Sequence, residues 1–223
     1  MFDKVTPDLT IYDEAHHIKA TFNKGYEIFL TATPSKYYYE FGDIIEKYDL
    51  RSAINDGYLT NYYINIFGDE GYSPDPVDCI AHIQQNNKKT IVYCNTNLSA
   101  KDLYYLWLDR GGKEENTYYI SCNTGKYERE LIYKSYKSKD KAIIFNCAIL
   151  GEGIDFTDCD SVFIYSGYTS INRIVQAVGR PLRLHENKTH ANIYMINDKH
   201  TSTRINAIAT YDPLAHSLVK YIY

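Results

Sequence analysis

Short β-branched and aromatic runs alternate with segments of helical periodicity, and this alternation limits the possible fold more than any other feature of the chain. The runs expected to be strands are 9–12, 26–30, 62–67, 90–93, 118–122, 142–145, 162–165 and 191–196. Helices are expected within 44–58, 77–85, 99–110, 125–138, 171–178 and 203–221, the last interrupted near Pro213. Because strands that alternate with helices form parallel sheets, the sequence predicts an α/β fold with a parallel sheet and helices on both of its faces.

A loop rich in Gly, Pro, Asp and Ser follows the third of these runs, from Gly68 to Pro76. The alternation of strands and helices is regular from this loop onward. We therefore predict two domains, residues 1–68 and residues 69–223.

The composition excludes several classes of protein. The 223 residues carry a formal charge of −4, so contact with nucleic acid must be local. No run is apolar for long enough to cross a bilayer, and we expect no membrane partner. The five cysteines form no C-x-x-C pair, which disfavours a zinc site or a disulfide framework. We expect an intracellular protein of a reducing compartment, in the cytoplasm or nucleus or of viral origin.

Polar residues follow the first two predicted strands. Asp13 and Glu14 come directly after the run 9–12, and Thr31 and Thr33 follow the run 26–30. In parallel α/β sheets, ligands bind at this end of the strands. Adjacent carboxylates there could hold Mg²⁺ and polarise a water molecule, although an acidic turn after a strand is equally compatible.

A second polar pattern, Q-x-x-G-R-x-x-R, comprises Gln176, Gly179, Arg180 and Arg183. Residues three positions apart on a helix share a face, so Arg180 and Arg183 are expected to point the same way. Two neighbouring guanidinium groups favour an anion such as phosphate. The alternative is a surface helix with two solvated arginines.

These patterns belong to a series of motifs: 13–16 (D-E-A-H), 31–34 (T-A-T-P), 48–59 (Y-x-L-x-x-A-I-x-x-G-Y-L), 91–96 (I-V-Y-C-N-T), 151–155 (G-E-G-I-D) and 176–183. In this order and spacing they resemble motifs II to VI of superfamily 2 DNA/RNA helicases of the DEAD/DEAH-box kind. The resemblance covers nearly the whole chain. It implies a complete second RecA-like domain, preceded by a partial first RecA-like domain. ATP and Mg²⁺ are the implied cofactors, and DNA or RNA is the implied partner.

The resemblance also implies roles in catalysis. Asp13 looks like the residue that binds Mg²⁺, and Glu14 like the residue that activates the attacking water. Gln176 and Arg180 are implied to lie at the domain cleft, and Arg183 looks like an arginine finger. In phosphoryl transfer, such an arginine adds on the order of 10³–10⁵ in rate.

The remaining implied roles concern nucleotide contact, coupling and nucleic-acid binding. Gly153 and Asp155 look like contacts to the nucleotide and between domains. Thr31 and Thr33 look like the motif that links hydrolysis to nucleic-acid binding. Backbone amides and hydroxyls near three residues could hold a phosphate backbone without reading bases: Asn95, Thr96 and Gly125.

One family motif is absent, because nothing in the chain matches the Gly-rich loop G-x-x-x-x-G-K-[ST]. We therefore expect the chain to begin partway through the first RecA-like domain. We also expect it to be inactive as an ATPase unless a separate polypeptide carries the P-loop. Two alternatives stay open: a non-enzymatic module that binds nucleic acid or a protein partner, and a decayed helicase fragment without function.

Overall fold

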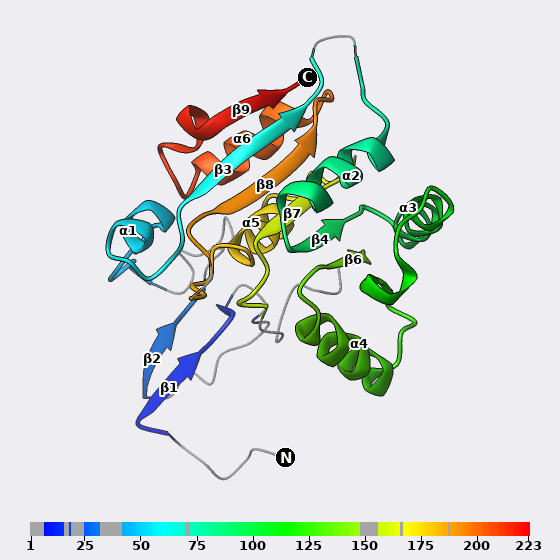
Figure 1. Cartoon of the computed structure of the whole chain (residues 1–223). Coiled ribbons are helices and arrows are strands. Elements are labelled where there is room, and N and C mark those ends of the chain that lie inside the picture. The colour runs from blue at the N-terminus through cyan, green and yellow to red at the C-terminus, as the bar shows by residue number, and fades with distance from the viewer. Residues whose placement is uncertain are drawn as a thin grey trace. The chain divides into compact units, whose positions relative to one another are not determined.

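The computed structural model describes residues 7–15, 18, 25–31, 42–69, 72–147, 156–165, 167–186 and 188–223. The chain divides into two compact units, Met1–Lys47 and Tyr48–Tyr223 (Figure 1). None of the helices in the described ranges is long and apolar enough to span a membrane.

A parallel sheet of seven strands organises the second unit, in the order β5-β6-β4-β7-β8-β3-β9. Its strands are β3 (Tyr62–Phe67), β4 (Lys89–Tyr93), β5 (Thr117–Ile120), β6 (Ala142–Asn146), β7 (Ser161–Ile164), β8 (Ala191–Ile196) and β9 (Val219–Ile222). Every residue of β4, β6 and β7 is buried. Near-continuous apolar strands of this kind are typical of parallel sheets that are covered on both faces.

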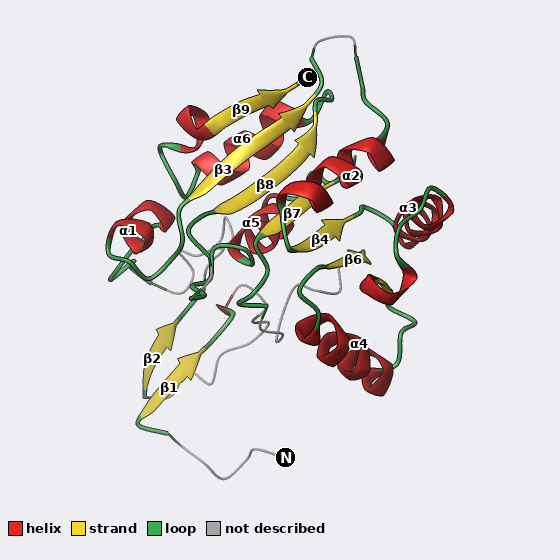
Figure 2. Ribbon diagram, viewed as in Figure 1, coloured by secondary structure: helices red, strands yellow, loops and turns green. Residues whose placement is uncertain are grey.

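Helices cover both faces of this sheet (Figure 2). They are α1 (Leu50–Asn55), α2 (Pro76–Asn86), α3 (Asn97–Asp109), α4 (Lys126–Ser138), α5 (Ile171–Gly179) and α6 (Thr201–Ala209), with 3₁₀ turns η3 (Glu114–Asn116) and η4 (Ala215–Leu218). Helices α2 and α3 share one hydrophobic cluster with the sheet, whereas α4, α5 and α6 share the other. Neighbouring residues of one strand, such as Ile91 and Val92, enter opposite clusters. The predicted α/β fold with helices on both faces is confirmed.

The first unit contains two described strands, β1 (Leu9–Tyr12) and β2 (Tyr26–Phe29), which pair in parallel. Exposed and half-buried residues alternate along both strands. The rings of Tyr12 and Phe29 stack with centroids 4.9 Å apart, and the Tyr12 hydroxyl donates to Glu27 at 2.8 Å. Each described strand therefore packs through one face only.

The division between the units differs from the predicted one. Strand β3 pairs with β8 and β9, so residues 62–67 belong to the second unit, and the division follows Lys47 instead of Gly68. The expected helical region 203–221, interrupted near Pro213, is corrected in its second part, because α6 ends at Ala209 and residues 219–222 form β9, which pairs with β3. Pairing with a neighbouring strand outweighs the weak local preference of so short a segment.

Candidate functional site

The acidic pair and the first threonine lie at the ends of two neighbouring strands in the first unit. Asp13 and Glu14 follow β1 directly, and Thr31 comes two residues after the end of β2. The backbone N–H of Ala15 donates to the carbonyl of Leu30 at 2.8 Å, so the segments beyond the two strands lie side by side. The structure therefore brings these three predicted residues together at the carboxyl end of the β1–β2 pair.

Glu14 has an unusual backbone conformation. Its φ is 49°, in the left-handed region that residues with a Cβ rarely adopt. Its N–H donates to Oδ1 of Asp13 at 2.9 Å, which stabilises the turn. Backbone strain of this kind costs on the order of 1–3 kcal/mol and is concentrated at functional sites. The strained turn is therefore a second reason, besides the strand ends, to place a site at these two acids.

Asp13 has the properties expected of a magnesium ligand. It is exposed, and a hard divalent cation prefers carboxylate oxygens. Within the described ranges, no three His, Cys, Asp or Glu side chains form a group that could hold a metal ion. A magnesium ion at Asp13 would complete its coordination with water and phosphate oxygens, as this ion commonly does.

Three of the predicted site residues fall outside the described residues: Thr33, Gly153 and Asp155. Their implied roles stay predictions.

In the second unit, the loops that follow β4, β5 and β7 leave the sheet at its carboxyl edge. Asn97 Nδ2 contacts Cys122 Sγ at 3.0 Å, which joins the first two loops. A Cβ added at Gly167, in the third loop, would come within 3.5 Å of the side chain of Asn95. The three predicted nucleic-acid residues all lie on this edge: Asn95, Thr96 and Gly125.

Two helices begin at this edge with different N-termini. In α3, the N–H of Ser99 donates to Thr96 Oγ1 at 3.1 Å and the N–H of Thr96 donates to Ser99 Oγ at 3.3 Å, which is a capping box. In α4, the N-cap is Gly125, and no side chain accepts from the first turn. Arg129, in that first turn, has a buried Nε without a hydrogen-bond partner among the described residues. The amides of α4 are therefore the better placed of the two sets to bind an anion.

The arginines of the Q-x-x-G-R-x-x-R pattern do not share a helix. Helix α5 carries Gln176 and ends at Gly179, and Arg180 is its C-cap. Arg183 lies beyond the helix, because Pro181 has no N–H with which to continue it. The prediction that both arginines point the same way from one helix face is therefore wrong.

Backbone pairing holds Arg183 instead. Arg183 forms an isolated antiparallel bridge with Leu59, and the N–H of Thr60 donates to the carbonyl of Leu182 at 2.7 Å. The segment between α1 and β3 therefore lies directly beside the segment that carries Arg183.

Arg180 is buried, with 5% of its surface exposed. Burial raises the pKa of the Tyr93 and Tyr133 hydroxyls, and the positive charge of Arg180 opposes that rise for both. Both hydroxyls are buried and have no hydrogen-bond partner in the part of the chain that the structure describes. The charge of Arg180 thus acts on two buried hydroxyls, one from β4 and one from α4.

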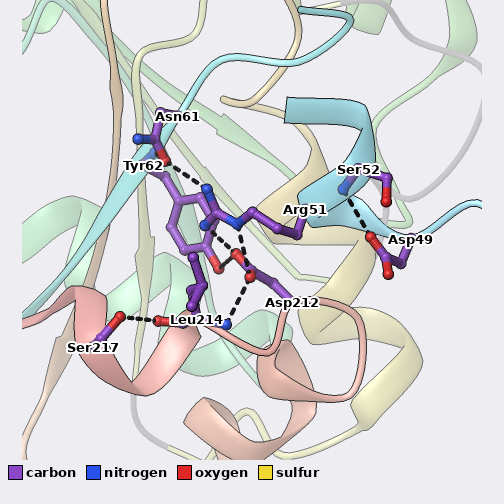
Figure 3. A network of polar contacts seen from close by, with 8 residues as sticks. All are labelled: Asp49, Arg51, Ser52, Asn61, Tyr62, Asp212, Leu214 and Ser217. Carbon is purple, nitrogen blue, oxygen red and sulfur yellow. Dashed lines mark hydrogen bonds and ion pairs between the residues drawn. The ribbon is translucent and has the colours of Figure 1, made fainter. Parts of the chain in front are cut away.

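A buried polar network around Asp212 in the second unit was not predicted (Figure 3). The Asp212 carboxylate accepts from Arg51 Nε at 3.0 Å, from Arg51 Nη2 at 2.5 Å and from the Tyr62 hydroxyl at 2.6 Å. Burial alone would raise the pKa of Asp212, but the hydrogen bonds from Arg51 and Tyr62 hold it below its usual value. The resemblance had pointed to the segment 48–59 that contains Arg51, whereas no sequence pattern pointed to Asp212.

Comparison with known families identifies the second unit. Residues 75–185 match the model of the helicase conserved C-terminal domain. The chain carries a helicase C-terminal domain. The predicted resemblance to the C-terminal portion of superfamily 2 helicases is confirmed.

Two curated relatives are helicases by name. The chain is 26% identical over 228 residues to "Probable helicase A859L" of African swine fever virus (isolate Tick/South Africa/Pretoriuskop Pr4/1996), which covers 84% of this chain and 26% of that protein. It is 29% identical over 110 residues to the Saccharomyces cerevisiae protein named as ATP-dependent helicase IRC3, covering 49% of this chain and 16% of that protein. The chain thus matches about a quarter or less of the length of these relatives.

A solved structure has the same fold. It is a fragment from Vibrio vulnificus YJ016, described as an HsdR subunit of a type I restriction enzyme. Its TM-score is 0.81 at 22% identity, and the match covers 96% of this chain and 48% of that one.

Proposed function

We propose that this chain is the C-terminal part of a nucleic-acid-dependent ATPase that couples ATP hydrolysis to movement along DNA or RNA. The observation that carries the proposal is the helicase C-terminal domain, in which the Q-x-x-G-R-x-x-R segment closes α5. The acidic pair at the end of β1 supplies the second group of residues that such a reaction needs.

Each of these residues has a physical role in the proposed reaction. Asp13 holds Mg²⁺, which neutralises charge on the phosphate oxygens. Glu14 orients and polarises the attacking water. Arg183 stabilises the negative charge that spreads over the transferred phosphoryl group, and Gln176 and Arg180 support its segment of the chain.

A phosphate-binding lysine completes this reaction, and the 223 residues contain no G-x-x-x-x-G-K-[ST] segment. We propose that this lysine comes from polypeptide outside these residues. The purified 223-residue chain should therefore show no ATP turnover that nucleic acid stimulates.

Reconstitution tests this proposal. A segment that carries G-x-x-x-x-G-K-[ST] would be added in trans or fused before Met1, and phosphate release would be measured with and without single-stranded DNA or RNA. Turnover should appear, rise with one of the two nucleic acids, and vanish in Glu14→Gln. Turnover by the unaided chain that depends on Glu14 would disprove the need for the added segment, and turnover insensitive to Glu14→Gln would disprove its role.

A non-enzymatic nucleic-acid-binding module is the second candidate, and the uncapped N-terminus of α4 favours it. In that case the chain alone would bind single strands through phosphate contacts. Fluorescence anisotropy should then show an affinity that falls with salt, because bound phosphates release counterions. Binding without any ATP turnover after reconstitution would select this candidate over the first.

A further inference from the structure

The network around Asp212 joins two consecutive elements of the second unit to a segment that lies 150 or more residues further along the chain (Figure 3). Arg51 lies in α1, Tyr62 begins β3, and Asp212 precedes η4 and β9. The Asp212 side chain is fully buried, and the Arg51 side chain is 14% exposed. A forked pair of hydrogen bonds from a guanidinium to a carboxylate fixes direction as well as distance. The network therefore sets the orientation of α1 and the start of β3 against the C-terminal segment.

Further contacts reinforce this junction. The N–H of Leu50 donates to the carbonyl of Tyr211 at 3.0 Å, and Arg51 Nη1 contacts Asn61 Oδ1 at 3.4 Å. Asp212 Oδ1 also accepts from the N–H of Leu214 at 2.9 Å. Both sides of the α1–β3 connection are thus held by the same carboxylate.

The α1–β3 connection is the segment that pairs with Arg183. Two of its residues, Leu59 and Thr60, form the bridge to Arg183 and the 2.7 Å bond to the carbonyl of Leu182. The N–H of Leu59 also donates to the carbonyl of Ala53 in α1 at 3.2 Å. An unbroken series of contacts therefore runs from Asp212, through α1 and Tyr62, to the backbone of Arg183.

Stability alone is a weak explanation for such a network. A buried ion pair usually gains little over apolar residues of the same volume, because both charges lose their hydration. What it does provide is a defined geometry. The Tyr62 hydroxyl adds a third bond whose only described acceptor is Asp212.

We propose that Arg51, Tyr62 and Asp212 are positioning residues that fix the backbone of Arg183 through Leu59 and Thr60. The inference rests on the proposed role of Arg183 in ATP hydrolysis. None of the three touches the reacting atoms; they act by holding the segment that Arg183 pairs with. A displacement of a catalytic group by about 1 Å can lower the reaction rate about 10²-fold. A loosened bridge between Leu59 and Arg183 would therefore lower the rate of ATP turnover.

Amide hydrogen exchange of the 223-residue chain tests the positioning directly. Tyr62→Phe keeps the shape of the ring and removes only the hydroxyl that donates to Asp212, and Asp212→Asn removes the charge. Both variants should raise exchange at the Thr60 amide by about tenfold, as for the loss of one net hydrogen bond. The amide of Cys94, which donates to Asn146 within the central strands, should be unchanged.

Lys89→Met is the matched control. Lys89 forms a buried ion pair with Asp158, and it lies in β4, apart from the Asp212 network. Its loss should not raise exchange at Thr60 more than at Cys94. Unchanged exchange at Thr60 in Tyr62→Phe and Asp212→Asn, or an equal rise at Thr60 and Cys94, would overturn the proposal in favour of a purely structural role.

Kinetics of the reconstituted ATPase give the second readout. Tyr62→Phe should lower kcat by about tenfold with little change in KM for ATP, because only transition-state stabilisation by Arg183 is affected. A raised KM with unchanged kcat would contradict the positioning role. If the wild-type protein shows no turnover after reconstitution, the proposed function fails, and the exchange experiment still decides whether the network fixes Arg183.

Discussion

The two units of the chain carry different parts of the proposed chemistry on very different supports. In the first unit, Asp13 and Glu14 follow a strand whose residues are exposed or half-buried, and Glu14 has a strained backbone. In the second unit, Arg180 and Arg183 follow a helix packed on a seven-stranded sheet whose central strands are fully buried. The proposed reaction thus combines acids that follow a partly exposed strand with arginines on a segment that a buried sheet supports.

The largest expected effect concerns Arg183. Arg183→Ala should reduce turnover of the reconstituted ATPase by on the order of 10³–10⁵, because it removes a charge that acts on the transferred phosphoryl group. Arg183→Lys should recover little of the loss, since an ammonium cannot reproduce the forked geometry of a guanidinium. Phosphate release at saturating ATP measures both variants.

Arg110→Ala is the control for this experiment. Arg110 pairs with Asp75 on an exposed surface, and an exposed pair contributes about 0–1 kcal/mol. Turnover should be unaffected. Full activity of Arg183→Ala would show that the arginine finger has been assigned to the wrong residue.

The difference in packing predicts a difference in stability. Phe145 is completely buried in β6, so Phe145→Ala should lower the free energy of unfolding by about 3–5 kcal/mol. Ile11 in β1 is 58% exposed, and Ile11→Ala should change it by less than about 1 kcal/mol. Urea unfolding followed by circular dichroism measures both. Equal losses would show that the first unit contributes a core comparable with that of the second.

Lowering the pH should reduce the stability of the second unit through protonation of Asp212. Its pKa in the folded protein is held below the usual value by Arg51 and Tyr62, against the effect of burial. The carboxylate therefore stabilises the fold above the unfolded pKa of about 3.9, and this contribution is lost as the pH falls below it. At pH 7, Asp212→Asn should cost about 1.5–3 kcal/mol, the range for hydrogen bonds to a charged group. The difference from wild type should shrink at pH 3 in urea unfolding.

Asp160 supplies a control of opposite sign. Burial raises its pKa in the folded protein, although the N–H groups of Lys88 and Lys89 donate to it. Its folded form therefore binds protons more readily than its unfolded form, and its contribution improves as the pH falls. In Asp160→Asn, this gain in stability with falling pH should be absent. A shift of the same sign in both variants would contradict the assignment for Asp212.

Much of this architecture follows from the sequence, because it depends on local pattern. The apolar runs that became β4, β6, β7 and β8 are bounded by turns, and the parallel arrangement follows from the helices between them. Asn95, Thr96 and Gly125 were named together through the family resemblance, and the structure places them at the edge where the parallel strands end. The positions of Asp13, Glu14 and Thr31 in the first unit follow from the rule that parallel strands end at one edge.

Other features depend on contacts that no local pattern records. Strand β9 has two exposed and two half-buried residues, so only its pairing with β3 reveals it as a strand. The bridge between Leu59 and Arg183 and the bond between Arg51 and Asp212 join segments that are far apart in the chain. The spacing of Arg180 and Arg183 suggested one helix face, but Pro181 ends that helix before the face is formed.

The smallest expected effects concern the N-termini of α3 and α4, at the carboxyl edge of the sheet. Thr96→Ala removes a capping box and should cost about 1 kcal/mol of stability. Gly125→Ser would add the side-chain cap that α4 lacks, and beyond its chain neighbours no heavy atom of the described residues lies within 4 Å of a Cβ at this position. Because serine is a slightly better N-cap than glycine, it should stabilise the protein by a few tenths of a kcal/mol. Urea unfolding measures both changes.

Binding of single strands by the Gly125→Ser variant then tests whether the uncapped N-terminus of α4 binds phosphate. A serine hydroxyl would compete with a phosphate for the first amides of α4, so affinity should fall while stability rises. The salt dependence of the remaining binding should become shallower, because one phosphate contact is lost. If affinity and stability rise together, the amides of α4 do not bind phosphate, and the contact must come from elsewhere on the carboxyl edge.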